Sequence, residues 1–162
     1  GTAAGGGTYS YLTPVNIAAQ ANAGYHFVQW QDGNTDNPRL VTVTQNATYI
    51  AQFAINGYAV SVGSNNSNMG SVSGSGSYDY NSTATIAATA YYGYHFVQWQ
   101  DGNTQNPRSI VVTGDALFTA QFAANSYLIT ANSSNITFGT ATGGGSYGYL
   151  QQVALAAGPV TH

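Results

Sequence analysis

The sequence contains the same twelve-residue block twice, GYHFVQWQDGNT at Gly24–Thr35 and again at Gly93–Thr104. The two blocks begin 69 residues apart, and the same spacing separates Gly1, Gly70 and Gly139, which open GTAAGGGTYSY, GSVSGSGSYDY and GTATGGGSYGY. An internal period of this length is typical of an array of small modules, each with its own core. The period therefore predicts three domains: a module lacking its first strand at residues 1–56, a complete module at 57–125 and a partial third module at 126–162.

The complete module has the pattern of short β-strands throughout. Residues 58–62 alternate apolar and polar side chains with the period of two that a half-buried strand requires. No segment carries apolar residues at helical spacing, so we expect an all-β protein with at most one helical turn, in the connection at residues 101–108. Five further strands are predicted between the Asp-Gly, Asn-Pro and Gly-Asp turns, at residues 70–80, 82–90, 94–100, 108–113 and 116–123.

Composition excludes several classes of function. Charged residues make up 4% of the chain, and Arg39 and Arg108 are its only basic residues, too few for the basic stripe that nucleic-acid binding needs. No run of about 20 apolar residues is present, so we expect no membrane insertion. Cysteine is absent, while the aromatic content of 13% argues against disorder. With a first residue other than methionine, we expect a mature or excised form of a longer, extracellular protein.

Several of these motifs occur in one known family. The order GSVSGSGSY, TATIAATA and GYHFVQWQDGNTQNPRSIVVTGDALFTAQFA resembles the divergent internalin B-type repeat, or Listeria–Bacteroides repeat, of bacterial surface proteins. The resemblance implies tandem, small, β-grasp-like or β-sandwich-like modules on secreted or surface-anchored proteins, without catalytic residues. Two features depart from the family pattern. The third copy ends in GPVTH where the other copies reach the glycine of GYHF, and lysine and glutamate are missing.

The aromatic residues of the repeated block are the predicted core. We expect Trp30 and Trp99 to be buried at equivalent places in the two copies. Around them we place two pairs of equivalent phenylalanines, Phe27 with Phe96 and Phe53 with Phe122.

The same block offers one catalytic hypothesis. In a regular strand His95, Val97, Trp99 and Asp101 would share one face, which makes His95 and Asp101 a candidate catalytic pair or half of a metal site. The alternative is a polar rim beside an aromatic core. A triad needs a positioned nucleophile, and a zinc site needs three or four ligands, whereas each repeat holds one histidine and no cysteine. We therefore expect no enzyme activity, no cofactor and no metal.

The loop after each block carries charged residues. Asp32, Asn34 and Asp36 imitate the start of a calcium loop, but position six is Asn37 and the chain has no glutamate for position twelve. A turn is the better interpretation. Arg39 lies seven residues after Asp32, as Arg108 does after Asp101, so each arginine either closes its loop like a clasp or stays solvated.

The recurring Tyr-x-Tyr motif raises a question about ligands. Cross-strand aromatic pairing or an interface between modules explains the tyrosines in a module this small. Stacking on a glycan is the alternative. The six residues of the motif are Tyr9, Tyr11, Tyr78, Tyr80, Tyr147 and Tyr149.

The phase of the repeat suggests how chains could associate. A sheet without its first strand exposes unpaired backbone groups, and the third module supplies a first strand without the later strands that would pair with it. We expect head-to-tail association with copies of itself, in which part of residues 127–157 completes the module at Gly1 of the next subunit. The alternative is a window cut from a longer tandem array. The predicted assembly residues are Tyr127, Leu128, Ile129, Tyr147, Tyr149, Val153 and Leu155.

These observations favour a non-enzymatic extracellular structural protein, a stalk or fibre subunit on the bacterial surface. The alternative is an adhesive module that recognises a glycan or a host protein through its tyrosines. Lysine-dependent isopeptide chemistry is closed to a chain without lysine.

Overall fold

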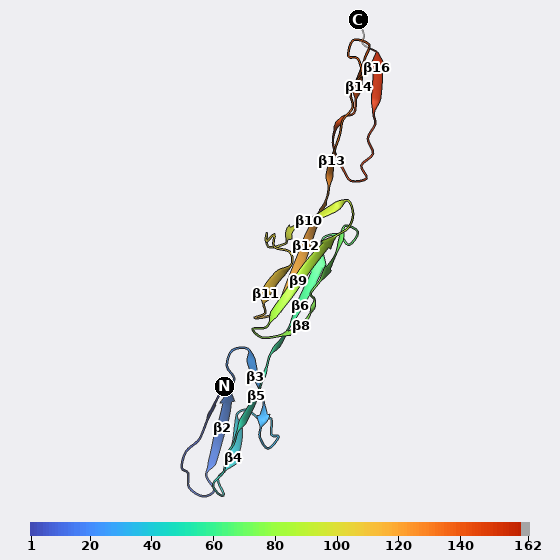
Figure 1. The fold of residues 1–162 in the computed structure, drawn as a ribbon. Coiled ribbons are helices and arrows are strands. Elements are labelled where there is room, and N and C mark those ends of the chain that lie inside the picture. The colour runs from blue at the N-terminus through green and yellow to red at the C-terminus, as the bar shows by residue number, and fades with distance from the viewer. Residues whose placement is uncertain (160–162) are drawn as a thin grey trace. The chain divides into compact units, whose positions relative to one another are not determined.

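The computed structural model describes residues 1–159, and every regular element among them is a β-strand (Figure 1). The predicted third module runs to residue 162, so its last three residues lie outside the described part. The chain divides into two compact units. One contains residues 1–61, 75–84 and 109–116, and the other contains residues 62–74, 85–108 and those from 117 onward. No helix that could cross a membrane occurs within residues 1–159.

The first repeat forms two small antiparallel sheets. One has the strand order β1-β2-β4, and β3 pairs with β5 in the other (Figure 1). In the second sheet, Phe27 lies opposite Phe53 and Trp30 opposite Ala51. The strands are β1 (Thr2–Ala4), β2 (Pro14–Gln20), β3 (Tyr25–Trp30), β4 (Arg39–Thr42) and β5 (Ala51–Ile55).

The second repeat has seven strands, in sheets of order β10-β12-β6-β8 and β11-β9-β7. The single strand predicted at residues 70–80 is wrong, because the chain turns out of one sheet and into the other at Gly74. This glycine has a φ of +103°, and a Cβ there would meet the carbonyl oxygen of Thr85. The strands are β6 (Gly57–Ser64), β7 (Gly70–Ser73), β8 (Gly76–Asp79), β9 (Thr83–Ala90), β10 (Tyr94–Trp99), β11 (Arg108–Val111) and β12 (Ala116–Ala124).

The partial third repeat forms two separate antiparallel pairs of strands. β13 (Ser126–Ile129) pairs with β15 (Gly145–Gly148), and β14 (Gly139–Thr142) pairs with β16 (Ala156–Pro159). β13 corresponds by position to the first part of β6, and β15 corresponds to β8. The β13–β15 pair thus repeats the β6–β8 pair, in which Tyr58 lies opposite Tyr78 as Tyr127 lies opposite Tyr147.

A β-bulge changes the faces predicted for the repeated block. The register of β10 against β12 shifts between Phe96 and Gln98, so one extra residue enters β10 at Val97. Trp99 consequently turns to the side of Phe96, with ring centroids 5.4 Å apart, and does not share a face with His95 and Val97, which are exposed. The regular alternation predicted for this strand is wrong for that reason.

The two tryptophans occupy equivalent, fully buried positions. Trp30 is 1% exposed and Trp99 is 0% exposed. The phenylalanines contact one another edge to face, Phe27 with Phe53 and Phe96 with Phe122, each pair at 6.2 Å between centroids. Phe122 is buried, whereas its counterpart Phe53 is only partly buried, as are Phe27 and Phe96.

Candidate functional site: an open groove in the first repeat

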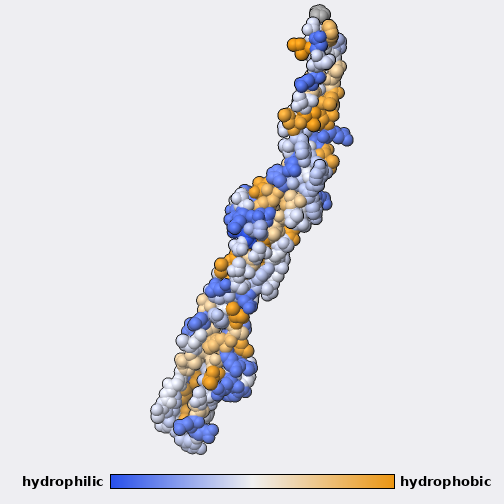
Figure 2. All heavy atoms as spheres, in the orientation of Figure 1, coloured by the Kyte–Doolittle hydropathy of each residue, from blue (hydrophilic) through white to orange (hydrophobic). Residues whose placement is uncertain are grey.

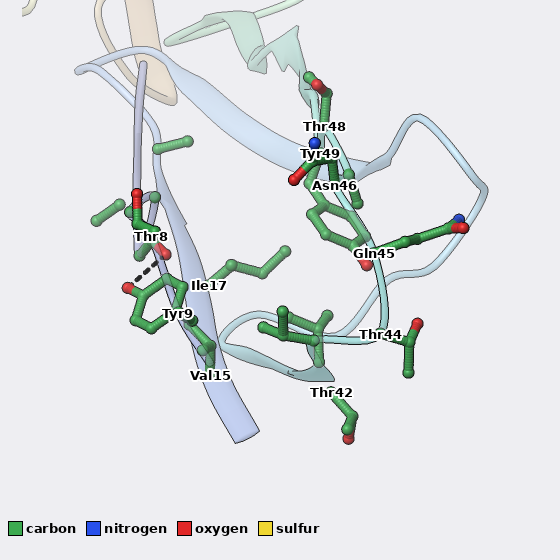
Figure 3. Close-up of a pocket in the computed structure, with 18 of the residues that line it drawn as sticks. Thr8, Tyr9, Val15, Ile17, Thr42, Thr44, Gln45, Asn46, Thr48 and Tyr49 are labelled. Carbon is green, nitrogen blue, oxygen red and sulfur yellow. Dashed lines mark hydrogen bonds between the residues drawn. The ribbon is translucent and has the colours of Figure 1, made fainter. Parts of the chain in front are cut away.

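The first repeat contains a groove of about 810 Å³ above its core. Val15, Ile17 and Trp30 contribute its apolar floor. Figure 3 shows Thr8 and Tyr9 on one side of this space and Asn46 and Tyr49 on the other, with Ile17 between them. The groove is therefore lined by apolar side chains at its base and by polar groups along its rim.

The second repeat has a strand, β6, with no counterpart among residues 1–56. Val60 in β6 is 2% exposed. Val112 is also buried in this repeat, whereas its counterpart Val43 is only partly buried and lines the groove of the first repeat. The groove is thus the position where the first repeat lacks the strand that the second repeat has.

Side chains at both ends of β6 bind it into the second repeat. The backbone N–H of Ala59 donates to the Asp115 carboxylate at 2.8 Å. The side chain of Asn65 donates to the Phe122 carbonyl at 3.1 Å and accepts from the Phe122 N–H at 3.0 Å. The position of Asp115 is taken by Asn46 in the first repeat, whose amide oxygen can accept the same bond from an incoming strand.

The segment that flanks the groove is not paired as a strand. In the second repeat, β8 forms regular antiparallel pairs with β6. The corresponding residues 7–10 are not a strand. Tyr9 instead donates its hydroxyl hydrogen to the Gly5 carbonyl at 3.0 Å. The first repeat therefore lacks strand pairing along this side of the groove.

The arginine clasp forms in both repeats. Nη1 of Arg39 lies 2.8 Å from the Asp32 carboxylate, and Nη1 of Arg108 lies 2.6 Å from that of Asp101. Each guanidinium also lies over an aromatic ring, Arg39 at 5.0 Å from the Tyr49 centroid. The hydrogen bond from the arginine lowers the pKa of both aspartates below the ordinary value. The clasp fixes the loop between the block and the next strand.

The histidines pair with asparagines and not with the aspartates. Nδ1 of His26 lies 2.8 Å from Oδ1 of Asn56, and Nδ1 of His95 lies 2.8 Å from Oδ1 of Asn125. Asp101, the proposed partner of His95, is bound by its arginine. Among residues 1–159, no group of three or more histidine, cysteine, aspartate or glutamate side chains could hold a metal ion.

A tyrosine packs on a glycine at the end of the first two repeats. A Cβ at Gly24 would overlap the ring of Tyr80, and a Cβ at Gly93 would overlap the ring of Tyr149. Asn56 links the first pair, since its N–H donates to the Gly24 carbonyl and its carbonyl accepts from Tyr80 N–H. Sequence reasoning missed this asparagine, although Asn125 recurs at the repeat spacing as a detectable signal.

Most of the predicted assembly residues lie on the surface of the third repeat. Leu128 is 77% exposed and Leu155 is 60% exposed. Tyr127 is also exposed, and Figure 2 shows hydrophobic residues at the surface of the segment from β13 to β16. The remaining four are partly buried, namely Ile129, Tyr147, Tyr149 and Val153.

Comparison with known families gives one match. A family model described as the divergent InlB B-repeat domain matches residues 1–57 and again residues 60–126. The two matches correspond to the first two repeats of the structure and leave out most of the third. No curated protein and no solved structure matches the chain significantly.

Proposed function

The chain belongs to the divergent InlB B-repeat family, and on this premise we propose that it is a non-enzymatic structural subunit of an extracellular stalk or fibre. Repeats of this family are non-catalytic and occur in bacterial surface proteins. The subunits associate head to tail, because a β-strand from the third repeat of one copy enters the groove in the first repeat of the next. The observation that carries this proposal is that groove, which coincides with the place of β6.

The strand β13 has the chemistry that the groove requires. Its residue Ile129 corresponds to Val60, whose side chain is buried in the second repeat. Leu128 corresponds to Ala59, and its N–H would meet Asn46 as the N–H of Ala59 meets Asp115. Main-chain bonds to β5 would provide affinity, while alternating side chains would fix the register.

This mode of association extends without closing on itself. The acceptor lies in the first repeat and the donor in the third, so two copies joined this way still present one groove and one strand. A heterologous contact of this kind produces a filament when its rotation does not close a ring. The extracellular location follows the family premise and the absence of cysteine and lysine chemistry in the chain.

Two changes to the donor test the proposal. Truncation after Asn125 removes the donor, and we expect it to abolish filaments in negative-stain electron microscopy. In the full chain, Ile129→Asp places a charge in the groove and should block assembly. Leu128→Asp is the matched control, because its counterpart Ala59 is exposed, and it should assemble. Filaments from the truncated chain as abundant as those from the full chain would refute strand insertion.

An adhesive function is the second candidate. Tyr92 is 85% exposed and Tyr91 is 49% exposed, side by side in sequence at the end of β9. Exposed rings of this kind stack on the apolar faces of sugars. Binding to a glycan array that is lost in Tyr92→Ala would support this function. Monodisperse particles without any filament would favour it over the structural role.

A further inference from the structure

Residues 139–150 are a near copy of residues 1–12. The two segments read GTATGGGSYGYL and GTAAGGGTYSYL, and nine of the twelve positions are identical. Their local structures agree as well. Tyr147 donates its hydroxyl hydrogen to the Gly143 carbonyl at 2.9 Å, as Tyr9 does to Gly5 at 3.0 Å. Leu150 and Leu12, at the end of each segment, have φ values of 60° and 64°.

The copy in the third repeat covers a defined site. β15 pairs with the whole of β13, from Ser126 opposite Gly148 to Ile129 opposite Gly145. Tyr149 packs on Gly93, and its N–H donates to the Asn125 carbonyl at 2.9 Å. The Tyr149 ring also contacts Tyr92 and Tyr94 edge to face, at 5.7 and 5.4 Å between centroids. We call β13, Gly93 and Asn125 the docking site.

The same contacts join the first repeat to the second. Tyr80 packs on Gly24, and its N–H donates to the Asn56 carbonyl at 2.9 Å. β8, just before Tyr80, pairs with β6, just after Asn56. The docking site is therefore the end of a repeat that receives the strand and tyrosine of the repeat that follows it.

The original segment in the first repeat leaves these contacts unmade. Tyr11, the counterpart of Tyr80 and Tyr149, is 73% exposed. Its turn is nevertheless held in place, because the Leu12 N–H donates to the Val43 carbonyl at 2.7 Å and the Val43 N–H donates to the Thr13 carbonyl at 3.0 Å. No described residue corresponds to Val43 in the third repeat. The first-repeat segment is thus the better anchored of the two.

We propose that the docking site binds residues 7–12 of a second copy of this chain, and that residues 145–150 occupy it as an internal substitute until that copy arrives. The inference rests on the proposed strand insertion. When β13 lies in the groove of a second copy, residues 7–10 of that copy must pair with the edge that β15 now holds, as β8 pairs with β6. Tyr11 of the second copy then replaces Tyr149 on Gly93.

The exchange replaces equivalent contacts with equivalent contacts, so it has little net effect by itself. The gain comes from the groove, where the apolar residues above Trp30 are covered only in the assembled form. Residues 145–150 therefore compete with assembly. The internal substitute keeps the exposed edge of β13 paired in a single chain, which opposes indiscriminate pairing with other edges.

Substitutions of the two equivalent tyrosines in the full chain test the competition. Tyr149→Ser weakens the internal substitute, and we expect it to lower the concentration needed for half assembly by roughly threefold to tenfold, the effect of one lost aromatic contact. Tyr11→Ser weakens the incoming segment and should raise that concentration by a similar factor. Sedimentation velocity over a concentration series measures both. Tyr80→Ser, which removes the same ring from the junction within the chain, is the control and should leave the concentration near that of the wild type.

Opposite shifts for the two tyrosines are the expected result. Shifts in the same direction, or no shift in either variant, overturn the competition. The Ile129→Asp variant keeps this result separate from the parent proposal: if it assembles like the wild type, strand insertion itself fails. If Ile129→Asp blocks assembly while Tyr149→Ser has no effect, strand insertion stands and the internal substitute is wrong.

Discussion

The substitution Trp99→Ala tests the assignment of the core. The Trp99 side chain is 0% exposed, and its Nε1–H donates to the Gln105 carbonyl at 2.9 Å. Truncating a buried tryptophan to alanine costs about 3–5 kcal/mol. The unpaired carbonyl of Gln105 adds about 1 kcal/mol if water does not reach it. This is a large part of the roughly 5–15 kcal/mol that stabilises a small domain.

Urea denaturation followed by far-ultraviolet circular dichroism measures this cost. With a slope of about 1–3 kcal/mol per molar urea, the midpoint should fall by roughly 2 M. Trp30 is then the only tryptophan in the chain, so its fluorescence reports the first repeat separately and should shift less. Trp99→Phe is the matched control, because it keeps an aromatic ring and loses the donor. An unchanged midpoint in Trp99→Ala would show that this side chain does not hold the core.

Three further predictions follow from other parts of the structure. The lowered pKa of Asp101 means that its ion pair with Arg108 stabilises the fold above about pH 4 and that this contribution is lost as the pH falls through the folded-state pKa. Arg108→Gln should therefore lower the melting temperature at neutral pH, with a smaller difference in strong acid; equal differences at both would refute the clasp. The double substitution of His26 and His95 by alanine should preserve the circular dichroism spectrum and cost at most about 1 kcal/mol per exposed hydrogen bond in urea denaturation. Gly74→Ala should destabilise by roughly 1–3 kcal/mol in the same assay, because alanine is strained at positive φ, and wild-type stability would show that the chain does not turn there as described.

The repeat and its strands could be predicted from the sequence because period and alternation are local signals. The spacing of 69 residues defines equivalent positions, and Trp30 and Trp99 are buried at such positions. The bulge at Val97 could not be predicted, since it depends on how two strands pair and leaves no mark on the alternation of one strand. The division of residues 70–80 depends in the same way on which sheet each half joins.

The groove was predictable in part. The phase of the repeat indicates that the first strand is missing from residues 1–56. The role of asparagine at the junctions was not predictable, because one side chain binds partners that lie far apart in sequence. Asn56 bonds both His26 and the turn at Gly24. Asn37, likewise, makes two bonds to the backbone of Ala19 with its amide, in the manner of a neighbouring strand.

Disulfide cross-linking between copies tests strand insertion most directly, and the absence of cysteine makes the chain suitable. The bond between Ala59 and Asp115 places the counterpart positions 128 and 46 next to each other when β13 enters the groove of another copy. Under oxidising conditions, the double variant Asn46→Cys and Leu128→Cys should form a ladder of covalent multimers on a denaturing gel. Each single variant should yield dimers at most. A double variant that remains monomeric, or that stops at dimers like the single variants, would contradict head-to-tail insertion of β13.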